Sequence, residues 1–114
     1  MRNALFAAAA ALWAASVAGA VEVAAIIYDE GELNFSLAGT GTVTVTAQAD
    51  YKYISAKTGE DSLARATSEP MKVKLAGEET PVKILFIPPE GAVTEVEIVV
   101  FVDGEEATRQ TFYY

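Results

Sequence analysis

The stretch that decides the fold is TVTVTAQADYKYIS, residues 42–55. Its side chains alternate between an apolar face, made by Val43, Val45, Ala47, Ala49, Tyr51 and Tyr53, and a polar face, made by Thr42, Thr44, Thr46, Gln48, Asp50 and Lys52. A period of two places one face of a strand against a core, and threonine, valine and tyrosine favour strands. We therefore expect a half-buried strand with a bend near residues 49–50, since the stretch is long for one strand.

Similar alternating segments lie on both sides of this stretch, at residues 21–28, 33–38, 71–76, 81–87, 94–102 and 107–114. Turn residues separate them, and Asp103-Gly104 is the strongest hairpin signal because both residues tolerate the positive φ of a type I′ turn. No window shows the 3.6-residue apolar stripe of a helix. About seven strands with closely spaced turns predict an all-β domain over residues 21–114, an immunoglobulin-like antiparallel β-sandwich.

Two segments are apolar on both faces, at residues 84–87 and 98–102. Strands covered on both sides have this composition, so we expect both segments to lie centrally in the sheets, unless one face contacts another protein. The longest connection, residues 56–70, is expected to cross between sheets with a helical turn, and Leu63 and Arg65 within it could dock on a sheet.

The composition excludes several kinds of chemistry. The 114 residues include no cysteine and no histidine, which removes the usual zinc, copper and haem ligands, disulfides, and Cys-His or Ser-His nucleophiles. Sixteen acidic and eight basic side chains give a net charge of −8, which repels nucleic acid and anionic lipid. We expect no enzymatic activity, no cofactor and no nucleic-acid partner. Glutamate enrichment with few Asn, Gln, Cys and Met residues is typical of thermophiles.

Residues 1–20, MRNALFAAAAALWAASVAGA, have the three parts of a secretory signal peptide. Arg2 supplies the positive charge, an apolar run follows, and small residues end the segment, with cleavage expected after Ala20 and with Ala18 and Ala20 as the recognised residues. The alternative is a retained apolar helix that contacts the membrane, because residues 4–21 carry no charge. Their high alanine content favours removal.

The segment KLAGEETPVKILFIPPEGAVTEVEIVVFVDGEE, residues 74–106, resembles the second half of immunoglobulin-like surface modules of archaea and bacteria, in particular the CARDB type. The likeness lies in a leucine and glycine-acidic turn, a proline-glycine turn and a last Asp-Gly hairpin, here Leu75, Gly77, Glu78, Pro88, Pro89, Gly91, Asp103 and Gly104. This resemblance implies adhesion, spacing or assembly and no catalytic residues. An uncleaved apolar helix before a β-rich head resembles the archaeal type IV pilins.

Several side chains are candidates for binding. Acidic residues cluster at 29–32, 60–61, 78–79 and 105–106 and could supply oxygens to Ca²⁺, although solvated turns are the favoured interpretation and no EF-hand spacing occurs. No pair of carboxylates stands out as a hydrolase site. Tyr51 and Tyr53 could stack on sugars, but they share the expected core face.

Asn34-Phe35-Ser36 is the single glycosylation sequon, so Asn34 is a candidate site provided that it faces solvent while Leu33, Phe35 and Leu37 face the core.

Both ends of the domain are candidates for contacts between molecules. Residues Val21, Val23, Ala25 and Ile27 are expected on one face of the first strand, which could pair within its own sheet or insert into another copy as a donor strand. The terminal Phe112, Tyr113 and Tyr114 either join the sheet or present an apolar contact.

The sequence thus predicts a non-enzymatic, exported cell-surface protein with a structural or adhesive role, which associates with itself or with other surface proteins and could form filaments. A pilin-like subunit with a retained helix, a small Ca²⁺- or carbohydrate-binding module, and least of all a small hydrolase are the alternatives.

Overall fold

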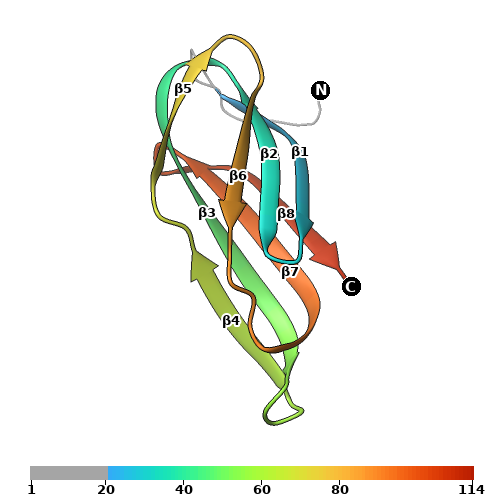
Figure 1. The fold of residues 1–114 in the computed structure, drawn as a ribbon. Coiled ribbons are helices and arrows are strands. Elements are labelled where there is room, and N and C mark those ends of the chain that lie inside the picture. The colour runs from blue at the N-terminus through green and yellow to red at the C-terminus, as the bar shows by residue number, and fades with distance from the viewer. Residues whose placement is uncertain (1–20) are drawn as a thin grey trace.

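The structure, a computed structural model, describes residues 21–114. It has eight strands, β1 Glu22–Asp29, β2 Glu32–Ala38, β3 Thr40–Ser55, β4 Asp61–Thr67, β5 Met71–Ala76, β6 Thr80–Leu85, β7 Gly91–Val102 and β8 Glu105–Tyr113. They form two antiparallel sheets, β1-β2-β6 and β4-β3-β7-β8 with β5 beside β3 (Figure 1). The expectation of an all-β fold with two packed layers is confirmed. The expected N-terminal helical segment and its cleavage residues, Ala18 and Ala20, lie outside the described residues.

Strand β3 organises the larger sheet. One side of β3 pairs with β7 along most of its length, while the other side pairs first with β5 and then with β4. The alternation expected for this strand is confirmed, because Val43, Val45, Ala47, Ala49 and Tyr51 are buried and Tyr53 is half-buried. Its irregularity lies a little later than expected, where the register with β7 shifts between Lys52 and Tyr53.

The core lies between the inner faces of the two sheets. Strand β2, central in the smaller sheet, contributes Leu33, Phe35 and Leu37, and β7, opposite it in the larger sheet, contributes Val96, Ile98 and Val100. All six are 3% exposed or less. Burial of this apolar surface is the main favourable contribution to folding in a chain without disulfides.

The connection at residues 56–70 was expected to cross between the sheets with a helical turn. Both parts of this prediction are wrong, because β3, β4 and β5 belong to one sheet and no helix occurs between them. The connection contains an eighth strand, β4, which pairs with β3 from Gln48↔Thr67 to Ile54↔Asp61. Its sequence DSLARAT alternates with a period of two, and its inward-facing residues are small, so the apolar signal was weak. Leu63 points away from the core and is 78% exposed, so it does not dock on the sheet.

Strands β6 and β7 were both expected to be central, but only β7 is. β7 lies between β3 and β8, and even Val99 on its outer face is fully buried. β6 has β2 as its one neighbour and forms an edge. Leu85 on the outer face of β6 is 72% exposed, and Ile87, which follows the strand, is 92% exposed. A segment that is apolar on both faces is typical of a strand covered on both sides, but the sequence alone does not show what covers each face.

Strand β1 was expected to place Val21, Val23, Ala25 and Ile27 on one face, which is wrong. Ala25 has a φ of 57° and lies in a bulge where the register with β2 jumps between Ala24 and Ile27. A bulge adds one residue and reverses the faces beyond it. Val21 and Val23 therefore contact the core together with Ile26 and Tyr28, whereas Ala25 and Ile27 are exposed.

Two tight turns use paired residues with positive φ. The Asp103-Gly104 hairpin is confirmed, with φ values of 51° and 84°, and Glu30-Gly31 joins β1 to β2 with values of 48° and 90°. In the part of the chain that the structure describes, no helix is long and apolar enough to cross a membrane.

Candidate functional site

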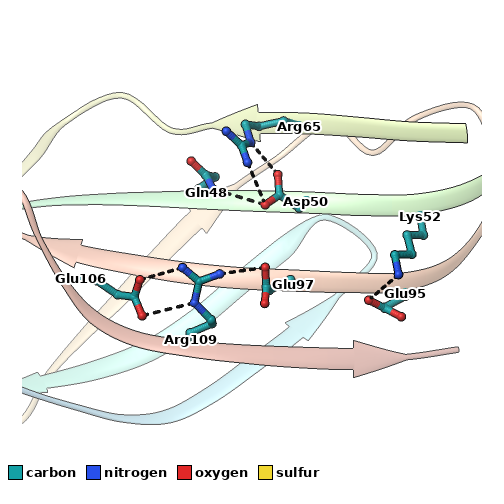
Figure 2. A network of polar contacts seen from close by, with 8 residues as sticks. All are labelled: Gln48, Asp50, Lys52, Arg65, Glu95, Glu97, Glu106 and Arg109. Atoms are coloured by element: carbon teal, nitrogen blue, oxygen red, sulfur yellow. Dashed lines mark hydrogen bonds and ion pairs between the residues drawn. The ribbon is translucent and has the colours of Figure 1, made fainter. Parts of the chain in front are cut away.

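Charged side chains are concentrated on the outer face of the five-stranded sheet. We call this the charged face and define it by the eight residues drawn in Figure 2, which are Gln48, Asp50, Lys52, Arg65, Glu95, Glu97, Glu106 and Arg109. They come from β3, β4, β7 and β8, and the strand register sets them in rows across the sheet. Neighbours across an antiparallel pair on one face lie close enough to interact.

Arg109 on β8 forms the most extensive contacts of the charged face. Its Nη1 lies 2.9 Å from Glu97 Oε1, and its Nη2 lies 2.7 Å from Glu106 Oε1. The hydrogen bonds with Glu106 raise the pKa of Arg109 and lower that of the Glu106 carboxyl. Arg109 therefore stays positively charged, and Glu106 stays ionised beside it, at neutral pH.

A second ion pair joins β4 to β3. Arg65 donates from Nε to Asp50 Oδ1 at 2.7 Å and from Nη2 to Oδ2 at 3.3 Å, and Gln48 donates to the same carboxylate. The hydrogen bonds with Asp50 raise the pKa of Arg65. Lys52 lies 3.5 Å from Glu95 in the next row.

Val99 is fully buried although its side chain lies on the charged face. It pairs with Gln48 on one side and Arg109 on the other, and it is absent from the core cluster between the sheets. The long stems of such polar side chains can cover an apolar neighbour while their ends stay in water. The charged face is thus an ordered surface rather than a set of independent solvated charges.

Three tyrosines form the polar contacts of the interior. The hydroxyls of Tyr28 and Tyr51 share a buried hydrogen bond at 2.7 Å, and the hydroxyl of Tyr114 donates to the carbonyl of Tyr28 at 3.2 Å. Burial, followed by the hydrogen bond with Tyr28, raises the pKa of Tyr51 above its ordinary value of 10. Tyr51 therefore stays neutral and joins the two sheets; it is not exposed for stacking on a sugar.

This pair predicts a loss of stability in alkali. The folded-state pKa of Tyr51 lies above 10, so above pH 10 the unfolded chain loses its proton first and the free energy of unfolding falls, by up to about 1.4 kcal/mol per pH unit. In Tyr51→Phe this dependence should shrink, and stability at neutral pH should drop by about 1–3 kcal/mol because the Tyr28 hydroxyl loses its partner. Urea unfolding between about pH 8 and pH 11 measures both effects, and parallel curves for the two proteins would contradict the prediction.

The acidic clusters proposed for Ca²⁺ do not converge. Among residues 21–114, no group of three or more acidic side chains is arranged to hold a metal ion. Glu32 is instead near Lys83, at 3.7 Å, and Glu106 binds Arg109. Two shallow hollows occur, one of about 280 Å³ beside Tyr53, Ser62 and Leu63, and one of about 390 Å³ around the Ala25 bulge.

The sequon residue Asn34 lies on the outer face of β2, half-buried, between Ile27 and Lys83 in the register. Its amide donates to Glu32 Oε2 at 2.8 Å, while Leu33, Phe35 and Leu37 face the core as expected. Glycosylation of Asn34 stays a prediction.

The terminal aromatic residues take three different environments. Phe112 packs against the core with its ring 6.2 Å from that of Tyr28, and Tyr114 reaches Tyr28 through its hydroxyl. Tyr113 is 75% exposed at the edge of the charged face. Of the three, Tyr113 therefore presents the largest free aromatic surface.

Sequence reasoning did not single out Arg109, Lys72 or Lys74 as surface residues of interest. The position of the two lysines could have been predicted, because the alternating sequence MKVKLA places both of them on the exposed side of β5. Arg109 had no such signal. Its partner Glu97 is known only from the register of β7 with β8, and Glu106, three residues away on β8, shares its face only because that register shifts between Val100 and Phe101.

Comparison with known proteins gives no family. No family model matches the chain, and no curated protein matches it. Among solved structures, an alkylpurine DNA glycosylase of Pseudomonas fluorescens, bound to DNA containing an abasic site analog, is similar with a TM-score of 0.44 and 14% identity. The match covers 82% of this chain and 30% of that one, so the chain spans less than a third of that protein. The functional proposal therefore depends on the residues of this chain.

Proposed function

We propose that the protein is exported and acts at the cell surface as a non-enzymatic structural or adhesive module with an immunoglobulin-like sandwich. The observation that carries the proposal is the arrangement of residues 21–114. Two antiparallel sheets enclose one apolar core, and the larger sheet presents an outer face with several ion pairs. Such a body offers edges and faces for contact with other proteins, which is what a spacer or adhesion domain requires.

The N-terminal sequence supports export. Residues 1–20 combine a positive charge, an apolar run and a small-residue end, which is the pattern of a secretory signal. A domain exported without cysteine has to be stable through packing alone. The eighteen buried apolar residues of the sandwich supply that packing, and Tyr28 and Tyr51 satisfy each other's hydroxyl groups inside it.

Strand donation is a second route by which such a module could assemble. β1 is an edge strand with five of its eight residues exposed, and the Ala25 bulge interrupts its pairing with β2. The bulge leaves β1 with fewer paired residues than an uninterrupted edge strand of its length would have. Donation would require β1 to leave β2 of its own chain, where it lies in this structure.

The proposal is tested by locating the protein and measuring its mass in the cells that produce it. We expect antibody to label the surface of intact cells, and the intact mass to correspond to a chain that begins at Val21. A protein found in the cytoplasm with residues 1–20 attached would contradict export. A surface protein that keeps residues 1–20 would instead favour the pilin-like alternative.

A further inference from the structure

The five-stranded sheet has two edges that pair with no other strand of residues 21–114. One edge is β8, and the other is β4 continued by β5. Tyr114 N donates to Thr94 O, so alternate residues of β8 bond inward to β7, and the intervening Arg109, Thr111 and Tyr113 direct their backbone groups outward. Such groups are a template for pairing with another strand.

The β4 edge has the same arrangement. Ser68 N donates to Ala47 O at 2.8 Å, which continues the ladder of inward-bonded residues along β4. The intervening Leu63, Arg65 and Thr67 therefore direct their N–H and C=O groups away from β3. Each edge thus has three residues available for hydrogen bonding in an antiparallel pair.

The two sets of edge residues lie in the same rows of the sheet. Lys52 pairs with Leu63 and Glu95, and Glu95 pairs with Tyr113, so one row ends in Leu63 on one edge and Tyr113 on the other. The two following rows end in Arg65 and Thr111, and in Thr67 and Arg109. If a second copy is placed beside the first without rotation, β8 of one copy lies antiparallel to β4 of the other. Each of the three rows of one copy then continues into the same row of the other.

The side chains at the ends of the first row are apolar and exposed. Leu63 is 78% exposed and Tyr113 is 75% exposed, and both lie on the same side of the sheet as Lys52 and Glu95. In the shifted arrangement they become direct cross-strand neighbours. An aromatic and an aliphatic side chain in that relation stabilise a strand pair.

The two edges also carry opposite charges at one end. On β5, Lys72 and Lys74 are exposed, and neither belongs to an ion pair among the described residues. Around the β7–β8 turn lie Asp103, Glu105 and Glu106. Val45 pairs with both Met71 and Val102, and Val102 pairs with Glu105, so the lysines and the acidic turn lie at about the same height on opposite edges. Opposite charges at this position favour the same sideways contact.

We propose that the partner of this module is a second copy of the same chain, bound edge to edge, with β8 of one copy paired antiparallel with β4 of the next and the β7–β8 turn beside the start of β5. The contact is heterologous, so each copy keeps one edge of each kind and copies add in a line. This inference rests on the proposed structural function and names its partner. It differs from strand donation because β1 stays in its own sheet.

The test compares charge variants of the purified protein by sedimentation velocity. We expect the wild type to assemble as its concentration rises. Lys72→Glu with Lys74→Glu opposes acidic groups at the contact. Glu106→Lys, at a position on the same face of the sheet as the two lysines, opposes basic ones. Each should weaken assembly roughly tenfold or more. An equal mixture of the two variants restores opposite charges at every contact and should assemble.

Controls separate this contact from general charge and folding effects. Lys57→Glu and Glu30→Lys make the same sign changes in the β3–β4 and β1–β2 turns and should leave assembly unchanged. Thr111→Pro removes one outward N–H without removing an inward ladder bond and should prevent assembly, while circular dichroism reports whether the sheet is intact.

Four results would overturn the inference. They are a wild type that remains monomeric at all concentrations, variants that assemble as well as the wild type, a mixture that fails to recover, and a lysine variant that assembles more readily. If the lysine variant assembled more readily, Lys72 and Lys74 would be residues that prevent edge-to-edge association of the wild type. Surface labelling is independent of these results, so a monomer found at the cell surface would overturn the edge contact alone.

Discussion

Gly91→Ala is expected to remove about 3–5 kcal/mol from the free energy of unfolding, enough to leave a marginally stable domain largely unfolded. Gly91 begins β7 with a φ of 145°, a region that side chains rarely adopt. A Cβ built there would lie 2.1 Å from the carbonyl oxygen of Ile54 and 3.1 Å from the amide nitrogen of Ala56. Both neighbours are backbone atoms, so a rotamer change cannot relieve the clash.

Gly59→Ala is the matched control for this prediction. Gly59 also has positive φ, 73°, but a Cβ at that position meets no atom within 4 Å. Its substitution should therefore cost only the backbone preference, about 1 kcal/mol. Thermal and urea unfolding of both variants measure the difference. Equal losses in the two would mean that the approach of β7 to the end of β3 is looser than described.

The alternation of residues was sufficient to predict most of the fold. Alternate residues from Leu33 to Leu37 and from Val43 to Tyr51 are buried, as a two-residue period predicts, because each of these strands is covered on one face. β4 was missed because Ala64 and Ala66 face inward with little apolar surface. The reversal of faces in β1 depends on one bulge at Ala25, and VEVAAIIY contains no glycine or proline that marks it.

The candidate site was less predictable than the fold. The sequence shows that charged residues alternate along the strands. The pairing of Arg65 with Asp50 and of Arg109 with Glu97, however, follows from register, which joins residues 15 and 12 positions apart. Register depends on which strands pair and where bulges occur. For the same reason, the shared rows of Leu63 and Tyr113 are visible only in the assembled sheet. Local pattern predicts the faces of a strand, and tertiary pairing determines its neighbours.

Leu33→Ala should cost about 3–5 kcal/mol, because Leu33 is fully buried on the central strand of the smaller sheet and its removal leaves a cavity between the layers. Leu85→Ala is the matched control from the neighbouring strand, β6, where Ile84 pairs with Leu33. Leu85 is 72% exposed, so its truncation should change stability by no more than about 0.5 kcal/mol.

Comparison of the two variants tests which apolar residues support the sandwich and which are available for contacts. Denaturant midpoints with an unchanged dependence on denaturant would give the two free-energy losses directly. A loss for Leu85→Ala close to that of Leu33→Ala would mean that the exposed side of β6 is covered, which in a purified sample requires another copy. In that case the loss would depend on protein concentration, and the smaller sheet would take part in assembly as well as the edges of the larger one.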